Sequence, residues 1–176
     1  MIHWMEPLPE LRIDYNEYRP FIGNDWFRRN YMWFAYGLMI VLTNVAFFTG
    51  GLVAGNFLTK LLIFIAVYPI HELLHILVAA PKGDLYLTHS GLYLWLTPSS
   101  PMSKWHYWLF MTLPLILLTA VPAVGSLFAP TEVKPFLVYI AWINSVIAGS
   151  DIINSPLILI KPNSSVFYRG YYKYKG

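Results

Sequence analysis

Four long apolar segments constrain the fold of this chain more than any other feature. They lie at residues 31–48, 57–80, 105–128 and 136–160. Each approaches or exceeds the length of about 20 residues that an α-helix needs to cross a bilayer. Because backbone groups in hydrocarbon must pair within the protein, the sequence predicts an all-α polytopic membrane protein with about four transmembrane helices.

The composition agrees with this class. Hydrophobic residues make up 57% of the 176 residues and charged residues 12%, against about 25% charged residues in an ordinary soluble domain. We expect one membrane-embedded domain over residues 1–176, with a cytoplasmic N-terminal segment at 1–30, a transmembrane core at 31–160 and a cytoplasmic tail at 161–176. Cysteine is absent, which excludes disulfide bonds and thiolate metal ligands.

The distribution of Lys and Arg predicts the orientation of the chain. If the segments cross in alternating directions from a cytoplasmic N-terminus, ten basic residues lie inside and two, Lys60 and Lys134, lie outside. The ten are Arg12, Arg19, Arg28, Arg29, Lys82, Lys104, Lys161, Arg169, Lys173 and Lys175. This bias predicts a multi-pass protein, expected in a bacterial cell membrane, with both termini cytoplasmic. The net charge of +3 then reflects membrane orientation, and no nucleic-acid partner is expected.

The second apolar segment contains the sequence HELLH at residues 71–75. Residues four apart lie on the same face of a helix, so His71 and His75 can bind one Zn²⁺ while Glu72 reaches a water held by the metal. Ionisable side chains are rare in spanning helices, which favours a functional site. The alternative is a pair of histidines that bond only to neighbouring helices.

A third metal ligand is expected, because a catalytic zinc usually has three protein ligands and an open position for water. Asp151 is the only carboxylate of the fourth segment. It lies about 22 Å along that segment, and His71 lies about 21 Å along its own, from the rise of an α-helix. Both segments run in the same direction under the alternating topology, so the two side chains are expected at one depth. Two alternatives are His106 as the third ligand and an ion pair between Asp151 and Lys104.

Other polar residues surround Asp151 in the fourth segment. Asn144 lies seven residues earlier, which places it on the same face of a helix, and Asn154 lies beside them. Gly149 before the aspartate and Pro156 after it weaken the helix locally. We therefore expect a local distortion that turns the carboxylate toward the protein interior.

A short β-hairpin is predicted between the second and third helices. Residues 84–97 contain two apolar, aromatic runs, LYL and LYLWL, around a turn at His89, Ser90 and Gly91. The exposed edge of such a hairpin could bind an unwound substrate segment by strand addition. Alternatively, the hairpin could pack against the helices as a plug.

These motifs together resemble a known family. From about residue 57 to residue 174, with HELLH, MSKWHYWLFMTLPLI at 102–116 and NSVIAGSDI at 144–152, the chain resembles the integral-membrane putative zincin peptidases, which are related in plan to site-2 proteases. The resemblance implies a zinc site of His71, His75 and Asp151, with Glu72 as the catalytic residue, on a membrane-embedded core of three helices.

The resemblance also suggests how the substrate is held. Asn144 is similar to the asparagine that site-2 proteases use to orient substrate. Apart from the resemblance, Asn154 of the fourth segment is a second candidate for substrate binding. The chain departs from those enzymes at the aspartate, where it has GSDI in place of the usual NxxPxxPLDG pattern.

The leading hypothesis is a zinc-dependent intramembrane or membrane-surface endopeptidase. It would hydrolyse membrane-protein or peptide substrates near the cytoplasmic face of the bilayer, with Glu72 as the base that activates water. The rival functions are a catalytically silent zinc-binding scaffold and a small metal transporter. The apolar outer halves of the spans disfavour transport. A homo-oligomer is compatible with the sequence.

Overall fold

The computed structural model describes residues 1–10, 13–14, 16–90 and 93–174. Arg12 and Lys175, which enter the orientation argument, and Gly91 of the predicted turn lie outside the described residues.

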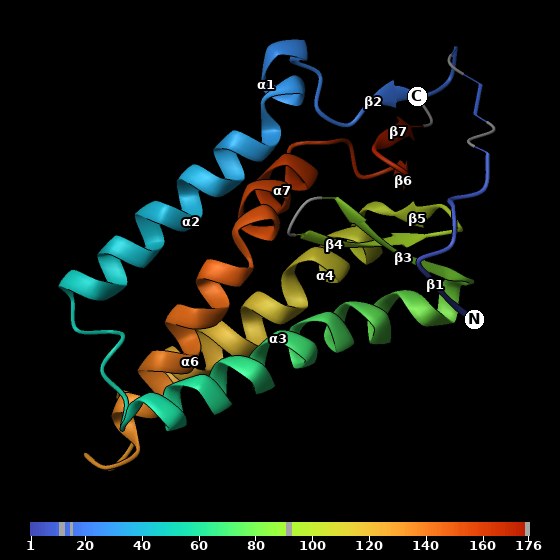
Figure 1. The fold of residues 1–176 in the computed structure, drawn as a ribbon. Helices are drawn as coiled ribbons and strands as arrows, with labels where there is room; N and C mark the ends of the chain where they lie inside the picture. Colours follow the sequence, from blue (N-terminus) through green and yellow to red (C-terminus); the bar gives the residue numbers. More distant parts are fainter. Residues whose placement is uncertain (11–12, 15, 91–92, 175–176) are drawn as a thin grey trace.

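The chain is mostly helical, and its long helices run side by side (Figure 1). The helices are α1 (Asp25–Arg29), α2 (Tyr31–Phe48), α3 (Phe57–Ala79), the 3₁₀ turn η1 (Ala80–Lys82), α4 (Lys104–Leu115), the π-helical turn η2 (Ile116–Ala120), α5 (Val121–Gly125), α6 (Lys134–Ile147) and α7 (Gly149–Leu159).

The described residues contain three helical segments long and apolar enough to cross a membrane: Tyr31–Phe48, Phe57–Lys82 and Lys104–Gly125. A fourth is present if α6 and α7, which meet at a bend of 69°, count as one broken span. These segments coincide with the four apolar segments of the sequence. They indicate a membrane protein.

Local sequence explains where several helices begin and bend. Asn56 starts α3, because its side-chain oxygen accepts a hydrogen bond from the backbone N–H of Thr59 at 2.9 Å. Pro114 lies in the last turn of α4, which ends at Leu115, and the π-helical turn follows from Ile116. Proline and π-turns both interrupt the regular backbone ladder, so they leave carbonyl groups that other side chains can bind.

Two small sheets lie at one end of the helices (Figure 1). In the first, β1 (Ile2–Trp4), β3 (Leu85–Ser90) and β4 (Tyr93–Pro98) pair in the order β1-β3-β4. In the second, β2 (Arg19–Pro20), β7 (Tyr171–Tyr174), β6 (Ser165–Tyr168) and β5 (Met102–Ser103) pair in the order β2-β7-β6-β5. The predicted hairpin is confirmed as β3 and β4, which pair antiparallel from Leu85 opposite Pro98 to Ser90 opposite Tyr93.

The predicted all-α class is correct for the long helices but incomplete, because a second sheet is present in addition to the predicted hairpin. Its strands β2 and β5 have two residues each and pair with partners far along the chain, Arg19 with Tyr172 and Met102 with Phe167. Strands this short carry no alternating pattern of their own. The segment at 161–176, expected as a tail, therefore contributes two strands to the fold.

Two apolar clusters fix the sheets to the helix ends. One joins α3, β3 and α4 through Val78, Leu85 and Phe110. The other joins the second sheet to α7 through Phe167 and Ile158. Both clusters hold the hairpin and the second sheet over the same end of the helices, where the first and last described strands, β1 and β7, also lie (Figure 1).

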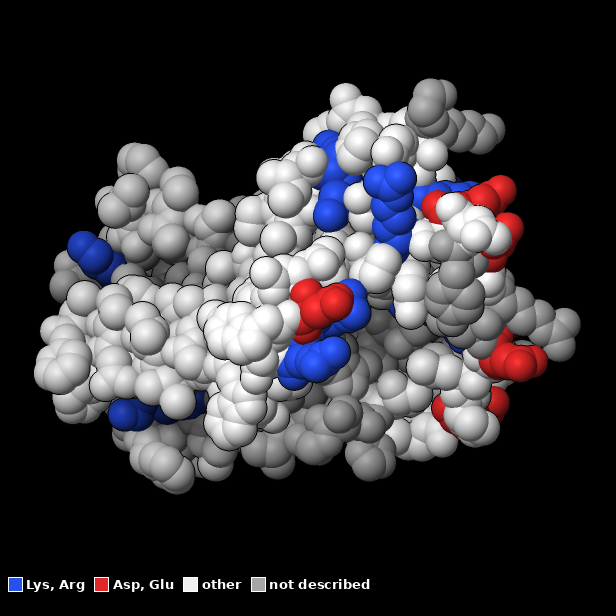
Figure 2. Space-filling view, turned by 90° about the horizontal axis from the view of Figure 1, so that it is seen from above, with Lys and Arg blue, Asp and Glu red and all other residues white. Residues whose placement is uncertain are grey.

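Charged side chains are unevenly distributed over the surface. On the face shown in Figure 2, most Lys, Arg, Asp and Glu atoms lie over the half of the molecule that carries the sheets. The helical half is largely uncharged on this face. This distribution agrees with helices in hydrocarbon and sheets at a polar boundary.

Candidate metal centre

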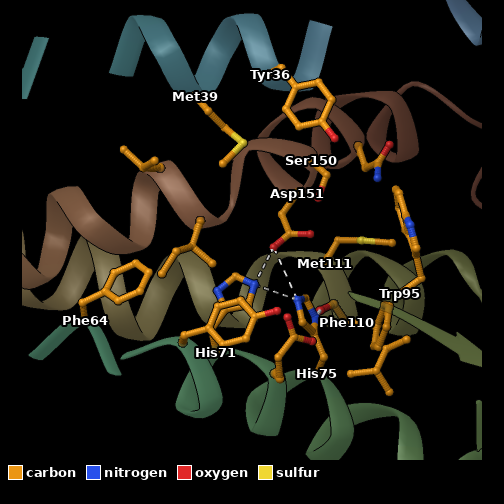
Figure 3. Close-up of a pocket in the computed structure, with 16 residues that line it drawn as sticks. Tyr36, Met39, Phe64, His71, His75, Trp95, Phe110, Met111, Ser150 and Asp151 are labelled. Carbon is orange, nitrogen blue, oxygen red and sulfur yellow. Dashed lines mark hydrogen bonds and ion pairs between the residues drawn. The ribbon is translucent and has the colours of Figure 1, made fainter. Parts of the chain in front are cut away.

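Three polar side chains from two helices meet inside the helical core. His71 and His75 project from one face of α3, and Asp151 projects from the first turn of α7. All three are buried, with exposures of 3%, 5% and 5%. The two Nε2 atoms lie 3.1 Å apart, and Oδ2 of Asp151 lies 3.2 Å from Nε2 of His71 and 3.4 Å from Nε2 of His75 (Figure 3). The predicted proximity of His71 and Asp151 is confirmed.

These spacings fit a tetrahedral zinc site. A zinc–nitrogen distance of about 2.0–2.1 Å places the ligand atoms of a tetrahedron about 3.3–3.4 Å apart. The three distances in the structure lie within a few tenths of an ångström of that value. In the described part of the chain, these residues form the group of histidine and acidic side chains able to hold a metal ion.

The hydrogen bonds made by Nδ1 of each imidazole determine which ring nitrogen carries the proton. The other nitrogen then presents its lone pair to the metal-ligand group. Nδ1 of His75 lies 2.6 Å from the carbonyl oxygen of Phe110, which can only accept, so this nitrogen donates. Nδ1 of His71 lies 2.9 Å from Oδ1 of Asn144. The amide nitrogen of Asn144 donates to the carbonyl of Pro114 and to Oγ1 of Thr119, so its oxygen faces His71 and accepts.

Both Nε2 atoms therefore present lone pairs toward Asp151. Its Oδ2 is a buried oxygen without a hydrogen-bond donor among the described residues. Three electron-rich atoms this close repel one another unless a cation lies between them. The donor set, two imidazoles and one carboxylate, suits a divalent ion such as zinc. The residues present thus fit the metal that the sequence predicts.

The bend between α6 and α7 brings Asp151 to this position. It occurs at Ala148, which separates the two helices. Gly149 follows, and a Cβ atom built there would lie 2.8 Å from Cγ of Met39, so the glycine permits close packing against α2. Tyr31 of α2 also donates to the carbonyl of Ser150 at 3.2 Å. The distortion expected near Gly149 is thus a change of helix direction.

A cavity of about 370 Å³ opens onto the three ligand atoms. Its polar lining includes Glu72 and Asn154 beside the metal-ligand residues, and its remaining wall is mostly apolar. In Figure 3, Tyr36 and Met39 approach from α2, and Trp95, Phe110 and Met111 lie toward the sheets. A site that is apolar around a few convergent polar groups is typical of small-molecule and peptide binding.

Asn144 lies behind His71 and not in the cavity. Its side chain is fully buried, at 0% exposure, and its oxygen and nitrogen are both used within the protein. This position does not fit the substrate contact expected from the sequence, because the amide is already saturated and inaccessible. Asn154, in contrast, lines the cavity as a substrate-binding residue would.

The two alternatives for Asp151 do not match the geometry. Nε2 of His106 donates to the carbonyl oxygen of Val78 at 2.8 Å, which joins α4 to α3 away from the ligand group. Nζ of Lys104 donates to the carbonyl groups of Leu159 and Lys161 at 2.8 and 2.6 Å, and to Oδ1 of Asn163 at 3.1 Å. Lys104 therefore caps the end of α7, and no ion pair with Asp151 forms.

The sequence gives no direct sign of the groups that fix the imidazoles, either by contact or through Asn144. Thr119 of η2 and the carbonyl of Pro114 in α4 hold Asn144, and the carbonyl of Phe110 in α4 accepts from His75. A backbone carbonyl carries no residue-specific signal. The proline at position 114 was the available sign that carbonyls would be exposed there.

Comparison with known proteins adds one match. A family model described as "Putative zincin peptidase" matches residues 64–166, more than half of the chain, and spans the HELLH motif, the hairpin and Asp151. No curated protein and no solved structure matches the chain.

Proposed function

The chain belongs to the putative zincin peptidase family, and from this premise we propose that it is a zinc-dependent endopeptidase of the membrane. Its substrates would be membrane proteins or peptides, hydrolysed near the cytoplasmic face of the bilayer. The observation that carries the proposal is the convergence of two imidazoles and one carboxylate on one point, beside Glu72, in one cavity. The further relation to site-2 proteases stays a prediction.

The metal would be held by His71, His75 and Asp151. Zinc bound there supplies a Lewis acid that polarises a carbonyl group and lowers the pKa of a bound water to about 7. Asn144 and the carbonyl of Phe110 keep the proton of each imidazole on Nδ1, so that Nε2 stays available as a ligand.

Glu72 is the proposed catalytic base and acid. Its carboxylate lines the cavity one residue after His71. It would accept a proton from the water whose oxygen adds to the peptide carbonyl carbon. It would then deliver that proton to the amide nitrogen as the carbon–nitrogen bond breaks, which releases a carboxylic acid and an amine. Asn154 lies in the same cavity, where its side-chain N–H groups could donate to a substrate carbonyl oxygen.

The β4 strand is the proposed docking edge for the substrate backbone. It is one of the two edge strands in the order β1-β3-β4, and Trp95 and Leu96 of this strand line the metal cavity. An extended peptide could pair with this edge and bring one of its carbonyl groups to the metal. If the hairpin served only as a plug, its free edge would not need to border the metal cavity.

The orientation with both termini in the cytoplasm is part of the proposal. The described parts of both terminal regions join sheets at the same end of the helices (Figure 1). Ten of the twelve basic residues fall on that side in the alternating topology.

The test combines metal content and hydrolysis. We expect about one zinc per chain in the wild type by elemental analysis, the same content in Glu72→Gln, and loss in Asp151→Ala. Hydrolysis of a quenched fluorescent peptide mixture should be lost in both variants, and Glu132→Gln in an exposed loop serves as the matched control.

Other outcomes separate the rival functions. Zinc retention with hydrolysis that Glu72→Gln leaves intact would refute the proposed role of Glu72. Zinc retention with no hydrolysis in the wild type would favour the scaffold, and zinc uptake into proteoliposomes would favour the transporter. A wild type purified without chelator that holds no metal would overturn the proposal as a whole.

A further inference from the structure

A second cavity, of about 420 Å³, adjoins the metal cavity. The two cavities share five lining residues, Trp95, Leu96, Phe110, Met111 and Asn154. The two cavities are therefore walled in part by the same side chains, and both border β4. The proposed function makes no use of this second cavity.

The second cavity follows the free edge of β4 toward the second sheet. Thr97 and Pro98 of β4 line it on one side, and residues 167–170, at the β6–β7 turn, line it on another. An extended chain advances about 3.3 Å per residue. A peptide paired with β4 would thus place a residue in this cavity a few positions from the bond at the metal-ligand group.

Arg169 is the unusual residue of this cavity. It forms a two-residue turn with Gly170 between the paired residues Tyr168 and Tyr171. Both turn residues have positive φ, 45° for Arg169 and 80° for Gly170. Glycine or asparagine adopts this conformation with less strain than arginine. An arginine held here suggests a use for its side chain.

The charge of Arg169 is not balanced within the described part of the chain. Its Nη1 donates to the carbonyl of Pro9, and its guanidinium carbon lies 5.3 Å from the ring centre of Tyr168. Its Nε is buried without a hydrogen-bond partner. No carboxylate described in the structure lies within ion-pair distance of it.

Arg28 lines the same cavity, but unlike Arg169 it has an acidic partner. Its Nη2 lies 2.7 Å from Oδ1 of Asp25, and its Nη1 donates to the carbonyl of Ile22 at 3.2 Å. Arg28 is therefore compensated by an acid in its own helix. Arg169 is left as a cation with unused donor capacity, which a carboxylate satisfies best because the guanidinium fork matches its two oxygens.

We propose that the second cavity is a substrate subsite that binds a carboxylate through Arg169. The carboxylate is either an Asp or Glu side chain or the carboxyl end of a peptide, a few residues from the hydrolysed bond. The inference rests on the proposed function, since it takes the metal cavity as the place where the peptide is cut. It adds a preference for acidic substrates.

Peptide binding tests the subsite independently of turnover. Fluorescent peptides of about eight apolar residues would carry one Glu, or Gln at the same position, each with a free or an amidated carboxyl end. Fluorescence anisotropy in detergent gives their Kd for Glu72→Gln protein. We expect the matching Glu or free-carboxyl peptide to bind about tenfold more tightly than its neutral counterpart.

Substitutions of Arg169 test whether its side chain binds the carboxylate. Arg169→Gln should remove the preference, and Arg169→Glu should invert it in favour of a peptide with Lys at the same position. The matched control is Arg19→Gln, because the guanidinium of Arg19 lies over the ring of Tyr174, outside the cavity. This variant should keep the preference. Equal binding of acidic and neutral peptides, or a preference that survives Arg169→Gln, would overturn the subsite.

Two further measurements separate the possible explanations. Cleavage-site mapping on a peptide library with wild-type protein should show Asp, Glu or a carboxyl end at a fixed distance from the cut. Hydrolysis without such enrichment would overturn the subsite and leave the proposed function standing. An Arg169-dependent binding preference without any hydrolysis would overturn the proposed function and leave carboxylate binding at Arg169 standing. If nanodiscs with phosphatidylglycerol abolish acidic-peptide binding, the cavity holds a lipid headgroup and the subsite is refuted.

Discussion

Replacing Asn144 with leucine should weaken zinc binding without touching a zinc ligand. Asn144 accepts a hydrogen bond from Nδ1 of His71 at 2.9 Å and donates to Pro114 and Thr119 at 3.1 and 2.9 Å. Leucine has the same branched skeleton of heavy atoms but can make none of these bonds. The imidazole of His71 then loses the group that fixes its proton and its ring orientation.

The expected magnitude follows from this geometry. Loss of the hydrogen bond behind a metal-binding histidine typically costs about 10- to 100-fold in metal affinity, or about 1.4–2.8 kcal/mol. The protein itself should also lose stability, because the carbonyl of Pro114 is left without its bond to Asn144, at a cost of about 1–3 kcal/mol. The two effects must be measured separately.

Asn144→Asp separates them. Aspartate keeps an oxygen that can accept from Nδ1 of His71 but cannot donate to Pro114 or Thr119 when ionised. It should therefore retain zinc affinity more closely than Asn144→Leu while also losing stability. Ser126→Ala, which removes a buried hydroxyl bonded to the carbonyl of Ala123, is the control that leaves the bonds of Asn144 and His71 untouched.

The assay is a competitive zinc titration against a chelator of known affinity, paired with thermal unfolding in detergent. Unchanged zinc affinity in Asn144→Leu would refute the role of the amide in positioning His71. Equal losses of affinity in the leucine and aspartate variants would attribute the effect to packing and not to the acceptor behind the imidazole.

Three further predictions concern stability, each measured as thermal unfolding in the same detergent. Lys104→Met should destabilise the protein by about 2–3 kcal/mol, because the part-buried carbonyl groups of Leu159 and Lys161 lose their charged donor. An unchanged melting temperature would contradict this cap. Gly51→Ala should destabilise by about 1–3 kcal/mol, since the new Cβ would lie 2.1 Å from Cδ1 of Trp142, whereas Gly37→Ala, with nothing within 4 Å, should be neutral or stabilising. A chelator should lower the melting temperature of the wild type and leave that of Asp151→Ala unchanged, because removal of the metal leaves lone pairs facing one another only where the carboxylate is present; equal shifts in both proteins would argue against this site.

The sequence predicts the long helices and the meeting of His71 with Asp151 because both follow from simple regularities. Apolar length fixes the spans, and the constant rise of a helix fixes the depth of a residue within its span. The predicted hairpin at residues 84–97 also holds, since its alternating aromatic runs are close in the chain.

The rest depends on contacts between distant segments. Gly149 and Pro156 signal a weakened helix, but no local rule gives the direction or the 69° size of the bend. The two-residue strands of the second sheet exist only because β6 and β7 offer them a partner. The position of Asn144 behind His71 depends on the π-helical turn, which local sequence does not specify.

The metal-ligand group joins α3 to α7, two helices that a ribosome completes at different times. In the proposed topology, the histidines and Glu72 would enter the bilayer before the aspartate has been synthesised. An unfinished chain therefore holds an incomplete ligand set, and the weak binding expected of two imidazoles alone delays metal loading until the last helix has been inserted. Assembly of the membrane domain and acquisition of hydrolytic competence would then be one event, so that no nascent chain carries an active centre into the insertion machinery.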